Sequence, residues 1–254
     1  VESGEQIKKD VRTMRSNMLN VDSLQFGEIT IGIPFSLGTL LFPYVLHCFR
    51  ERYPGIAVQL VEKSTYELER GVSSGELDLA VSALPMTNPL LRTCPLFESR
   101  MVLFMACELS EKGCKKHGCC HKPYEEFDLK KAADTPFVIG HRGQSTRAII
   151  ELMFKKANIH PPIYLQTRNN ETIKRVVSES NAAGILPEIY LYPHECCCHL
   201  HYYYIAPEYD ERYSVVAFHD DNLSLAARTC LQILKEICKS LDSNAILAPA
   251  HRLS

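Results

Sequence analysis

The order of the apolar segments is the feature that most constrains this chain, because strand-like and helix-like periods alternate along it. Ile29, Ile31 and Ile33 alternate with polar or small residues, which is the period of a strand. Apolar residues then recur at helical spacing through residues 37–49. Further segments predict a strand at 56–61, a helix at 65–74 and a strand at 77–81. This β-α-β-α-β order favours a parallel sheet with right-handed crossovers.

Pro43 lies inside the first predicted helix and limits where that helix begins. A proline is tolerated in the first turn, where the backbone amides have no partner within the helix. We therefore expect Gly38 or Thr39 to cap this helix.

The same order recurs in the second half of the chain. Its predicted strands and helices are strands 137–140, 163–165 and 183–187 and helices 145–157 and 171–180. The two halves share almost no side chains, so only the pattern repeats. Ser36 and Ser145 each follow a strand and open a helix, and we expect both to cap their helices. With strands at 101–106 and 214–218 and a helix at 221–241, the simplest assembly is two α/β lobes joined by two chain crossings, near residues 99 and 215.

The composition excludes several classes of protein. The chain has 254 residues, 46% of them hydrophobic, so it can bury a core. Its formal charge of −2 is too balanced for a protein that grips nucleic acid over its whole surface. No apolar run approaches the ~18–20 residues of a membrane span, and the charged first ten residues do not form a signal peptide. If this amino end is native, we expect a cytoplasmic protein that has no membrane partner.

Residues 5–22 predict a solvated helix with a thin apolar stripe of Ile7, Val11, Met14 and Met18. That stripe is too narrow to form a core alone, so this helix should pack on another part of the protein or on a second copy.

Five segments, in order, resemble the effector-binding domain of LysR-type transcriptional regulators. They are Gly27–Ile33, Phe49–Pro54, Gly75–Val81, Ile173–Val177 and Ala183–Pro187. The resemblance covers roughly residues 5–241. It implies an α/β fold of the periplasmic-binding-protein-like type II class, with two Rossmann-like lobes joined by two crossover strands. The implied division is the end of a linker helix (1–23), lobe I (24–98 plus 216–242), lobe II (99–215) and a tail (243–254).

The resemblance also implies a function. A small polar or anionic effector would bind between the lobes and control transcription through an N-terminal winged helix-turn-helix, which would lie before Val1 and would bind DNA. The family forms homo-oligomers, dimers or, at full length, tetramers. We expect helices 40–52 and 221–241 to supply the dimer interface, as surface helices with apolar residues to spare. No cofactor is implied.

The effector site is expected beyond the carboxyl ends of the strands, where helix amino termini converge and favour anions. Ser36, Gln144, Ser145 and Thr146 would supply hydroxyls and amides there, and Thr167 would complete the polar ring. Phe35 and Leu37 would lie against an apolar part of the effector. Arg147 would add charge if it turned inward. The alternative is that the serines only cap their helices.

Eleven cysteines, an odd number, do not indicate a disulfide framework and suggest thiols in a reducing compartment. Two clusters have spacings that can hold a metal. The first is Cys114, His117, Cys119, Cys120 and His121, and the second is His194, Cys196, Cys197, Cys198, His199 and His201, of which Cys196, Cys198 and His199 are the leading candidates. Neither has the paired spacing of a zinc finger. Metal binding, thiol-based sensing and no role at all remain open. The peroxide-sensing branch of the family has a reactive cysteine where this chain has Gln144, Ser145 and Thr146, which argues against that mechanism.

Catalysis is not expected. His141 lies near Ser145 in sequence, but no third group or elbow motif accompanies them. Asp78 lies in a predicted strand, where a structural role is more plausible, and glycine-rich phosphate motifs are absent. Two other classes share the architecture: an exported solute-binding protein, and a bilobal transferase or dehydratase. The gene sequence upstream of Val1 would distinguish these classes from a regulator. A helix-turn-helix there would establish the regulator, and a signal peptide would overturn it.

Overall fold

The computed structural model describes residues 26–106, 124–191, 200–221 and 223–240. The predicted helix at 5–22 and the tail at 243–254 lie outside these residues. The described residues form two compact units. Unit 1 runs to Phe97 and resumes at Ser214, and unit 2 is Glu98–Tyr213. Strands β4 (Arg92–Ala106) and β10 (Arg212–His219) carry the chain from one unit to the other.

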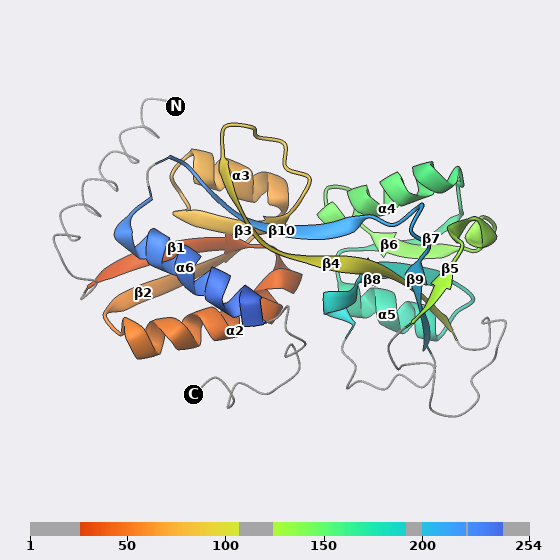
Figure 1. The fold of residues 1–254 in the computed structure, drawn as a ribbon, viewed down its shortest axis with the longest axis horizontal. Coiled ribbons are helices and arrows are strands. Elements are labelled where there is room, and N and C mark those ends of the chain that lie inside the picture. Colours follow the sequence, from red (N-terminus) through yellow and green to blue (C-terminus); the bar gives the residue numbers. More distant parts are fainter. Residues whose placement is uncertain (1–25, 107–123, 192–199, 222, 241–254) are drawn as a thin grey trace. The chain divides into compact units, whose positions relative to one another are not determined.

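Unit 1 has the predicted β-α-β-α-β order, and its β1 pairs in parallel with both β2 and β3. Strand β10 adds to β3 in the antiparallel direction, which gives the order β2-β1-β3-β10. Helices α2 and α6 cover one face of this sheet and α3 covers the other (Figure 1). The elements are β1 (Gly27–Ile33), α2 (Phe35–Arg52), β2 (Ile56–Glu62), α3 (Thr65–Ser73), β3 (Leu79–Ala83) and α6 (Leu225–Ser240).

Helix α2 begins earlier than the sequence predicted. Its first residue is Phe35 and its N-cap is Pro34, so the predicted caps at Gly38 or Thr39 are wrong. Pro43 therefore lies in the interior of the helix, where it lacks the amide that would complete one backbone hydrogen bond. Burial of Leu37, Leu41, Val45 and three further residues holds the helix on the sheet despite that loss.

Unit 2 repeats the order, with β6 lying in parallel between β7 and β8. Strand β4 pairs antiparallel with β8 and β9, and the short β5 pairs with β9. Helices α4 and α5 lie on opposite faces (Figure 1). The elements are β5 (Glu125–Phe127), η2 (Leu129–Ala132), β6 (Phe137–Gly140), α4 (Ser145–Ala157), β7 (Ile163–Thr167), α5 (Asn170–Ser178), β8 (Ala183–Pro187), η3 (Glu188–Tyr190) and β9 (Leu200–Ile205).

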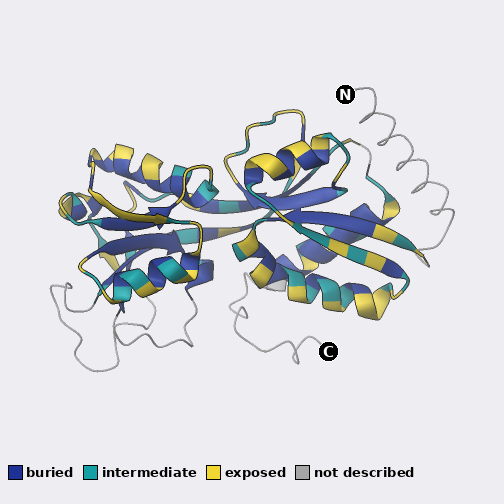
Figure 2. Cartoon of the chain, turned by 180° about the vertical axis from the view of Figure 1, so that it is seen from behind, coloured by how far each residue is buried: buried dark blue, intermediate teal, exposed yellow. Residues whose placement is uncertain are grey.

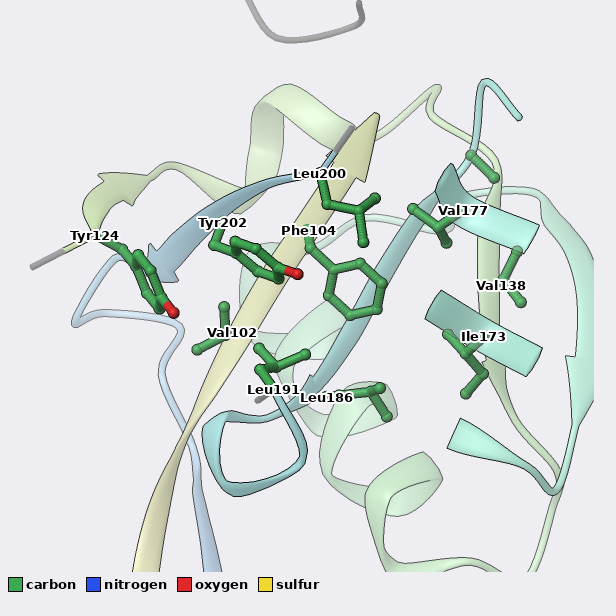
Figure 3. Close-up of a cluster of buried hydrophobic side chains, with 11 residues drawn as sticks. Val102, Phe104, Tyr124, Val138, Ile173, Val177, Leu186, Leu191, Leu200 and Tyr202 are labelled. Carbon is green, nitrogen blue, oxygen red and sulfur yellow. The ribbon is translucent and has the colours of Figure 1, made fainter. Parts of the chain in front are cut away.

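Each unit has its own apolar core, and the central strands are the most buried elements (Figure 2). In unit 1, Phe218 packs with Leu68, Val72 and Leu77. In unit 2, Phe104, Val138 and Leu186 belong to a cluster of eleven buried residues (Figure 3). The Phe104 ring lies over Gly184, its cross-strand partner, so closely that a Cβ on Gly184 would meet the ring at 2.5 Å. Only glycine fits there without a shift.

The two helices expected to form the dimer interface, α2 and α6, are neighbours within unit 1. Within unit 1, α2 and α6 pack against each other, and Arg52 of α2 pairs with Glu236 of α6 at 2.7 Å. On α2, Phe42, Tyr44, Leu46 and Cys48 are half-buried and Phe35 is exposed, while Leu225 is the large exposed apolar side chain of α6. The use of these helices as a dimer interface stays a prediction. In unit 2 the exposed large apolar side chains lie on α4 and β7, at Leu152, Ile163, Tyr164 and Leu165.

Candidate functional site

The carboxyl ends of the parallel strands define one edge in each unit. In unit 1 this edge carries the ends of β1, β2 and β3, and in unit 2 it carries the ends of β6, β7 and β8. In both units the first helix, α2 or α4, begins at this edge directly after the first strand. Helix amino termini are favourable places for anions because their backbone amides and dipoles point outward.

The predicted residues of unit 1 occupy the first turn of α2 but differ in access. Phe35 is the first helical residue and its side chain is 62% exposed. Ser36 is half-buried. Leu37 is wholly buried, so it packs in the core and offers no surface to a ligand. The N-cap is Pro34, which makes no side-chain cap hydrogen bond, so the prediction that Ser36 caps this helix is wrong.

Glu62 is a residue of this edge that the sequence analysis missed. It ends β2, and its Oε1 lies 3.2 Å from the position that a Cβ on Gly38 would occupy, beside the first turn of α2. Its side chain is exposed. The predicted strand ended one residue earlier, at Val61. An acidic residue directly after the apolar strand was the signal that could have pointed to this edge.

In unit 2 the residue at the start of α4 fastens two loops together. Gln144 is the N-cap, which makes the prediction that Ser145 caps this helix wrong. Its side chain does not cap the helix either. Instead, its Oε1 accepts from the His141 amide at 2.7 Å and its Nε2 donates to the Arg168 carbonyl at 3.3 Å. The loop before α4 and the loop after β7 are thereby held side by side.

The remaining predicted residues lie on these two loops or on the first turn of α4. Ser145 is half-buried and Thr146 is buried. Thr167 ends β7, and its hydroxyl accepts from the Asn169 amide at 3.3 Å. The exposed Arg142 and Arg168 lie in the two joined loops, so this edge carries basic residues that the sequence analysis did not include.

Arg147 is held by contacts within unit 2. Its guanidinium is buried and donates to the Gly140 carbonyl and to Gln166 Oε1, both at 3.3 Å. It also pairs with Glu151 at 2.7 Å. This arginine therefore fixes the start of α4 to β6 and β7, and a contribution of its charge to the effector site stays a prediction.

The second helix of each unit begins in a different way from the first. At α3, the Glu67 carboxylate accepts from the Ser64 amide at 3.0 Å in a capping box. At α5, the Asn169 side chain accepts from the Glu171 amide, and Glu171 lies in the first turn. The N-cap residues of α2 and α4, Pro34 and Gln144, make no side-chain cap bond, and the first turns of these helices have no acidic residue. Their positive ends thus lack the acidic first-turn side chain that α3 and α5 have.

The other residues considered in the sequence have structural surroundings or lie outside the described residues. Asp78 accepts from the Thr30 amide at 2.7 Å, which joins β1 to the segment before β3. Except for His201, both Cys/His clusters lie in residues 107–123 and 192–199, outside the described part. Within the described part, no group of three or more metal-ligating side chains comes together. No helix there is long and apolar enough to cross a membrane.

Comparison with known proteins gives the same architecture. Residues 23–239 match the family model described as LysR substrate binding domain. The HTH-type transcriptional regulator YwbI of Bacillus subtilis is 28% identical over 162 residues, which cover 64% of this chain and 50% of the relative. The chain thus spans about half the length of the curated relatives it matches.

Solved structures agree on the fold. The regulatory domain of Synechocystis CcmR, in complex with 2-PG, superposes with a TM-score of 0.70 at 19% identity, over 85% of this chain and 99% of that one. The effector-binding domain of QuiR, in complex with shikimate, gives 0.68 at 17% identity and the same coverage. The chain belongs to the LysR substrate-binding domain family and has its periplasmic-binding-protein-like type II fold.

Proposed function

We propose that this chain is the ligand-sensing part of a LysR-type transcription regulator and that its effector is a small polar or anionic molecule. The observation that carries the proposal is the start of α4 in unit 2. A helix start with no acidic residue in its first turn, two hydroxyl residues and two arginine-bearing loops fastened by Gln144 favour a carboxylate or phosphate group. That small molecules occupy the QuiR and CcmR domains supports the same kind of function here.

Unit 1 would bind the less acidic end of the effector. Phe35 is exposed at the first turn of α2, where it can cover an apolar portion, and Ser36 can exchange a hydrogen bond. The nearby Glu62 carboxylate would disfavour a second acidic group and favour a hydroxyl or ammonium. Leu37 would only support these residues from the core. We therefore expect an effector with one acidic end and one neutral or basic end.

A metabolite panel screened by thermal shift tests this proposal. A ligand at 100 times its Kd should stabilise the chain by about 2.7 kcal/mol. The Ser145→Ala, Thr146→Ala double variant should weaken an acidic hit several-fold, because a helix terminus contributes about 0.3–1 kcal/mol toward an anion and the hydroxyls add to it. Calorimetric Kd values are the measurement, since Thr146 is buried and its loss also changes stability.

Ser178→Ala is the matched control, because it removes a hydroxyl from α5 that bonds only within its own helix. Its affinity for the hit should equal that of the unmodified chain. If the hits are purely apolar, or if the double variant binds the acidic hit unchanged, the effector is not bound at the start of α4.

The remaining properties of the regulator are proposed from its membership of the family. We propose that DNA is bound by a winged helix-turn-helix in a region that this chain does not contain, that the protein acts in the cytoplasm, and that it has no catalytic activity. We also propose that it forms homo-oligomers, dimers or, at full length, tetramers. Sedimentation of this chain at micromolar concentration, giving a species larger than ~29 kDa, is the expected result.

A metal or thiol sensor is the second candidate function, and one observation favours it. Ala106 and Leu200 are cross-strand partners on β4 and β9, so the segments that follow Ala106 and precede Leu200 join the sheet at the same place. Both segments carry Cys and His residues with ligand chemistry. Metal analysis of anaerobically purified protein is the test, and less than a tenth of an equivalent excludes a metal.

A further inference from the structure

The short helix η3 follows β8 at the carboxyl edge of unit 2 and contacts both strands that leave this unit. The Ile189 amide donates to Ser99 Oγ on β4 at 3.2 Å. The Tyr190 hydroxyl bonds the Tyr213 hydroxyl on β10 at 3.0 Å, and the two rings meet edge to face. Both bonds are buried, so they hold η3 to β4 and β10 without competition from solvent.

Glu188 adds a third connection through an aromatic side chain. The Tyr204 hydroxyl on β9 donates to Glu188 Oε1 at 3.0 Å, and the Arg100 guanidinium of β4 lies 3.8 Å from the centre of the Tyr204 ring. Burial raises the pKa values of Tyr204 and Tyr213 to about 12, so both hydroxyls keep their protons at neutral pH. All three residues of η3 are thus fastened to the neighbouring strands.

A second set of contacts joins η3 to the edge where α4 begins. The buried Lys174 of α5 donates to the Tyr190 carbonyl at 3.4 Å and pairs with Glu171 at 2.6 Å. Glu171 lies in the first turn of α5, directly after the loop whose Arg168 carbonyl accepts from Gln144. From Gln144 to Tyr213 the connection therefore consists of the bond to Arg168, the backbone of residues 168–171, the Glu171–Lys174 ion pair, and the bonds from Lys174 to Tyr190 and from Tyr190 to Tyr213.

We propose that η3, through Tyr190, is a positioning element that couples the edge of unit 2 where α4 begins to the strands that carry the chain into unit 1. This rests on the proposed function, because it assigns to that edge a route by which an occupied effector site acts on the crossings. A buried group with bonds on two sides transmits a displacement better than a solvated loop, because its partners cannot be replaced by water.

Hydrogen exchange on the ligand-free chain tests the coupling without knowing the effector. Lys174→Met removes the ammonium from α5 and should speed exchange at residues 212–216 by about threefold, the size of a modest coupling between residues in one network. In a Tyr190→Phe background, which cuts the bond to Tyr213, Lys174→Met should no longer affect those residues. A merely structural Lys174 would give the same effect in both backgrounds.

Tyr209→Phe is the matched control, because Tyr209 is another buried tyrosine of unit 2 and lies outside these contacts. It should leave exchange at 212–216 unchanged. If Lys174→Met does not fold, Glu171→Gln breaks the same ion pair more gently. The proposal is overturned if neither variant changes exchange at 212–216, if Tyr190→Phe leaves the effect intact, or if both units accelerate equally. An effector that fails to bind at α4 would contradict the proposed function and leave this result unaffected.

Discussion

In both units the first strand lies between two parallel neighbours and the first helix starts at the carboxyl edge, yet the charges around the two helix starts are opposite. In unit 1 the Glu62 carboxylate lies beside the first turn of α2. In unit 2, Arg142 and Arg168 lie in the loops that Gln144 joins beside α4. The second helices, α3 and α5, begin alike, each with a cap and an acidic residue. One topology therefore places opposite charges beside the starts of the first helices, whereas the starts of the second helices are alike.

The prediction with the largest expected effect concerns whether the two units, which have separate apolar cores, also unfold separately. Phe218→Ala and Phe104→Ala each remove a wholly buried ring and should cost about 3–5 kcal/mol. Hydrogen exchange should accelerate most in residues 27–83 for Phe218→Ala and in residues 137–187 for Phe104→Ala. Tyr164→Ala, at an exposed site, is the control. Equal acceleration of both units by either core variant would show one cooperative structure.

The helix starts can be compared directly by removing their polar side chains. Ser64→Ala at α3 and Asn169→Ala at α5 should each lower the free energy of unfolding by about 1 kcal/mol, because each removes a helix-capping interaction. Gln144→Ala should cost less than about 0.5 kcal/mol, since its bonds are exposed and do not cap α4. Urea unfolding measures all three. A cost for Gln144→Ala as large as the others would remove the contrast between first and second helices.

Glu62→Gln should remove the negative charge beside the start of α2 and so make this helix start more similar to that of α4. We expect it to lower stability by about 0.3–1 kcal/mol, because a carboxylate beside the first turn of α2 stabilises the helix. The same variant should tighten the binding of an effector with two acidic groups, measured as a calorimetric Kd. Glu98→Gln, an exposed acid of β4, is the control for a general charge effect. Unchanged affinity for such a ligand would exclude Glu62 from the effector site.

The smallest effects concern acid stability, and two aspartates give opposite signs. In unit 1 the hydrogen bond from Arg92 lowers the pKa of Asp221 below 3.8. The unfolded chain then binds more protons than the folded one, so this contribution is present above the ordinary pKa and is lost as the pH falls. In unit 2 burial raises the pKa of Asp210 above 3.8, only partly offset by Arg212 and Arg100. Folded Asp210 therefore holds its proton to higher pH, and stability falls as the pH rises through that window.

Urea midpoints between pH 3 and pH 6 measure these contributions. Asp221→Asn should remove a loss of stability on acidification, and this effect should shrink in high salt because the pair is exposed. Asp210→Asn should remove a gain on acidification. Equal pH profiles for the two variants would contradict the difference between the units.

Much of the fold was predictable because the spacing of apolar residues indicates which segments form strands and which form helices. Helix α4 has the predicted bounds, Ser145–Ala157, since its apolar spacing is regular and Asn158 ends it in the left-handed conformation. The start of α2 was not predictable from Pro43 alone, because tertiary burial outweighs the local cost of an interior proline. Strand β9 was missed although Leu200–Ile205 contains three tyrosines, which favour strands.

The candidate site was predictable only in its location. The carboxyl edge follows from parallel strand order, so the positions of Ser36 and Ser145 at helix starts could be expected. Which of these side chains can still contact a ligand could not be predicted, because this depends on contacts with residues distant in sequence. Arg147 is occupied by Gly140, Gln166 and Glu151. Gln144 reaches 24 residues along the chain to Arg168 instead of capping its own helix.

The two crossings have a consequence for synthesis on the ribosome. Unit 2 is continuous, whereas unit 1 is interrupted and lacks β10 and α6 until all of residues 98–213 have been made. At about 5–20 residues per second, this delay is on the order of ten seconds. During that time β3 lacks its β10 partner and the face of α2 that packs on α6 is uncovered. The inserted unit is therefore expected to complete its fold first, and the nascent unit 1 is the part that chaperones would need to protect.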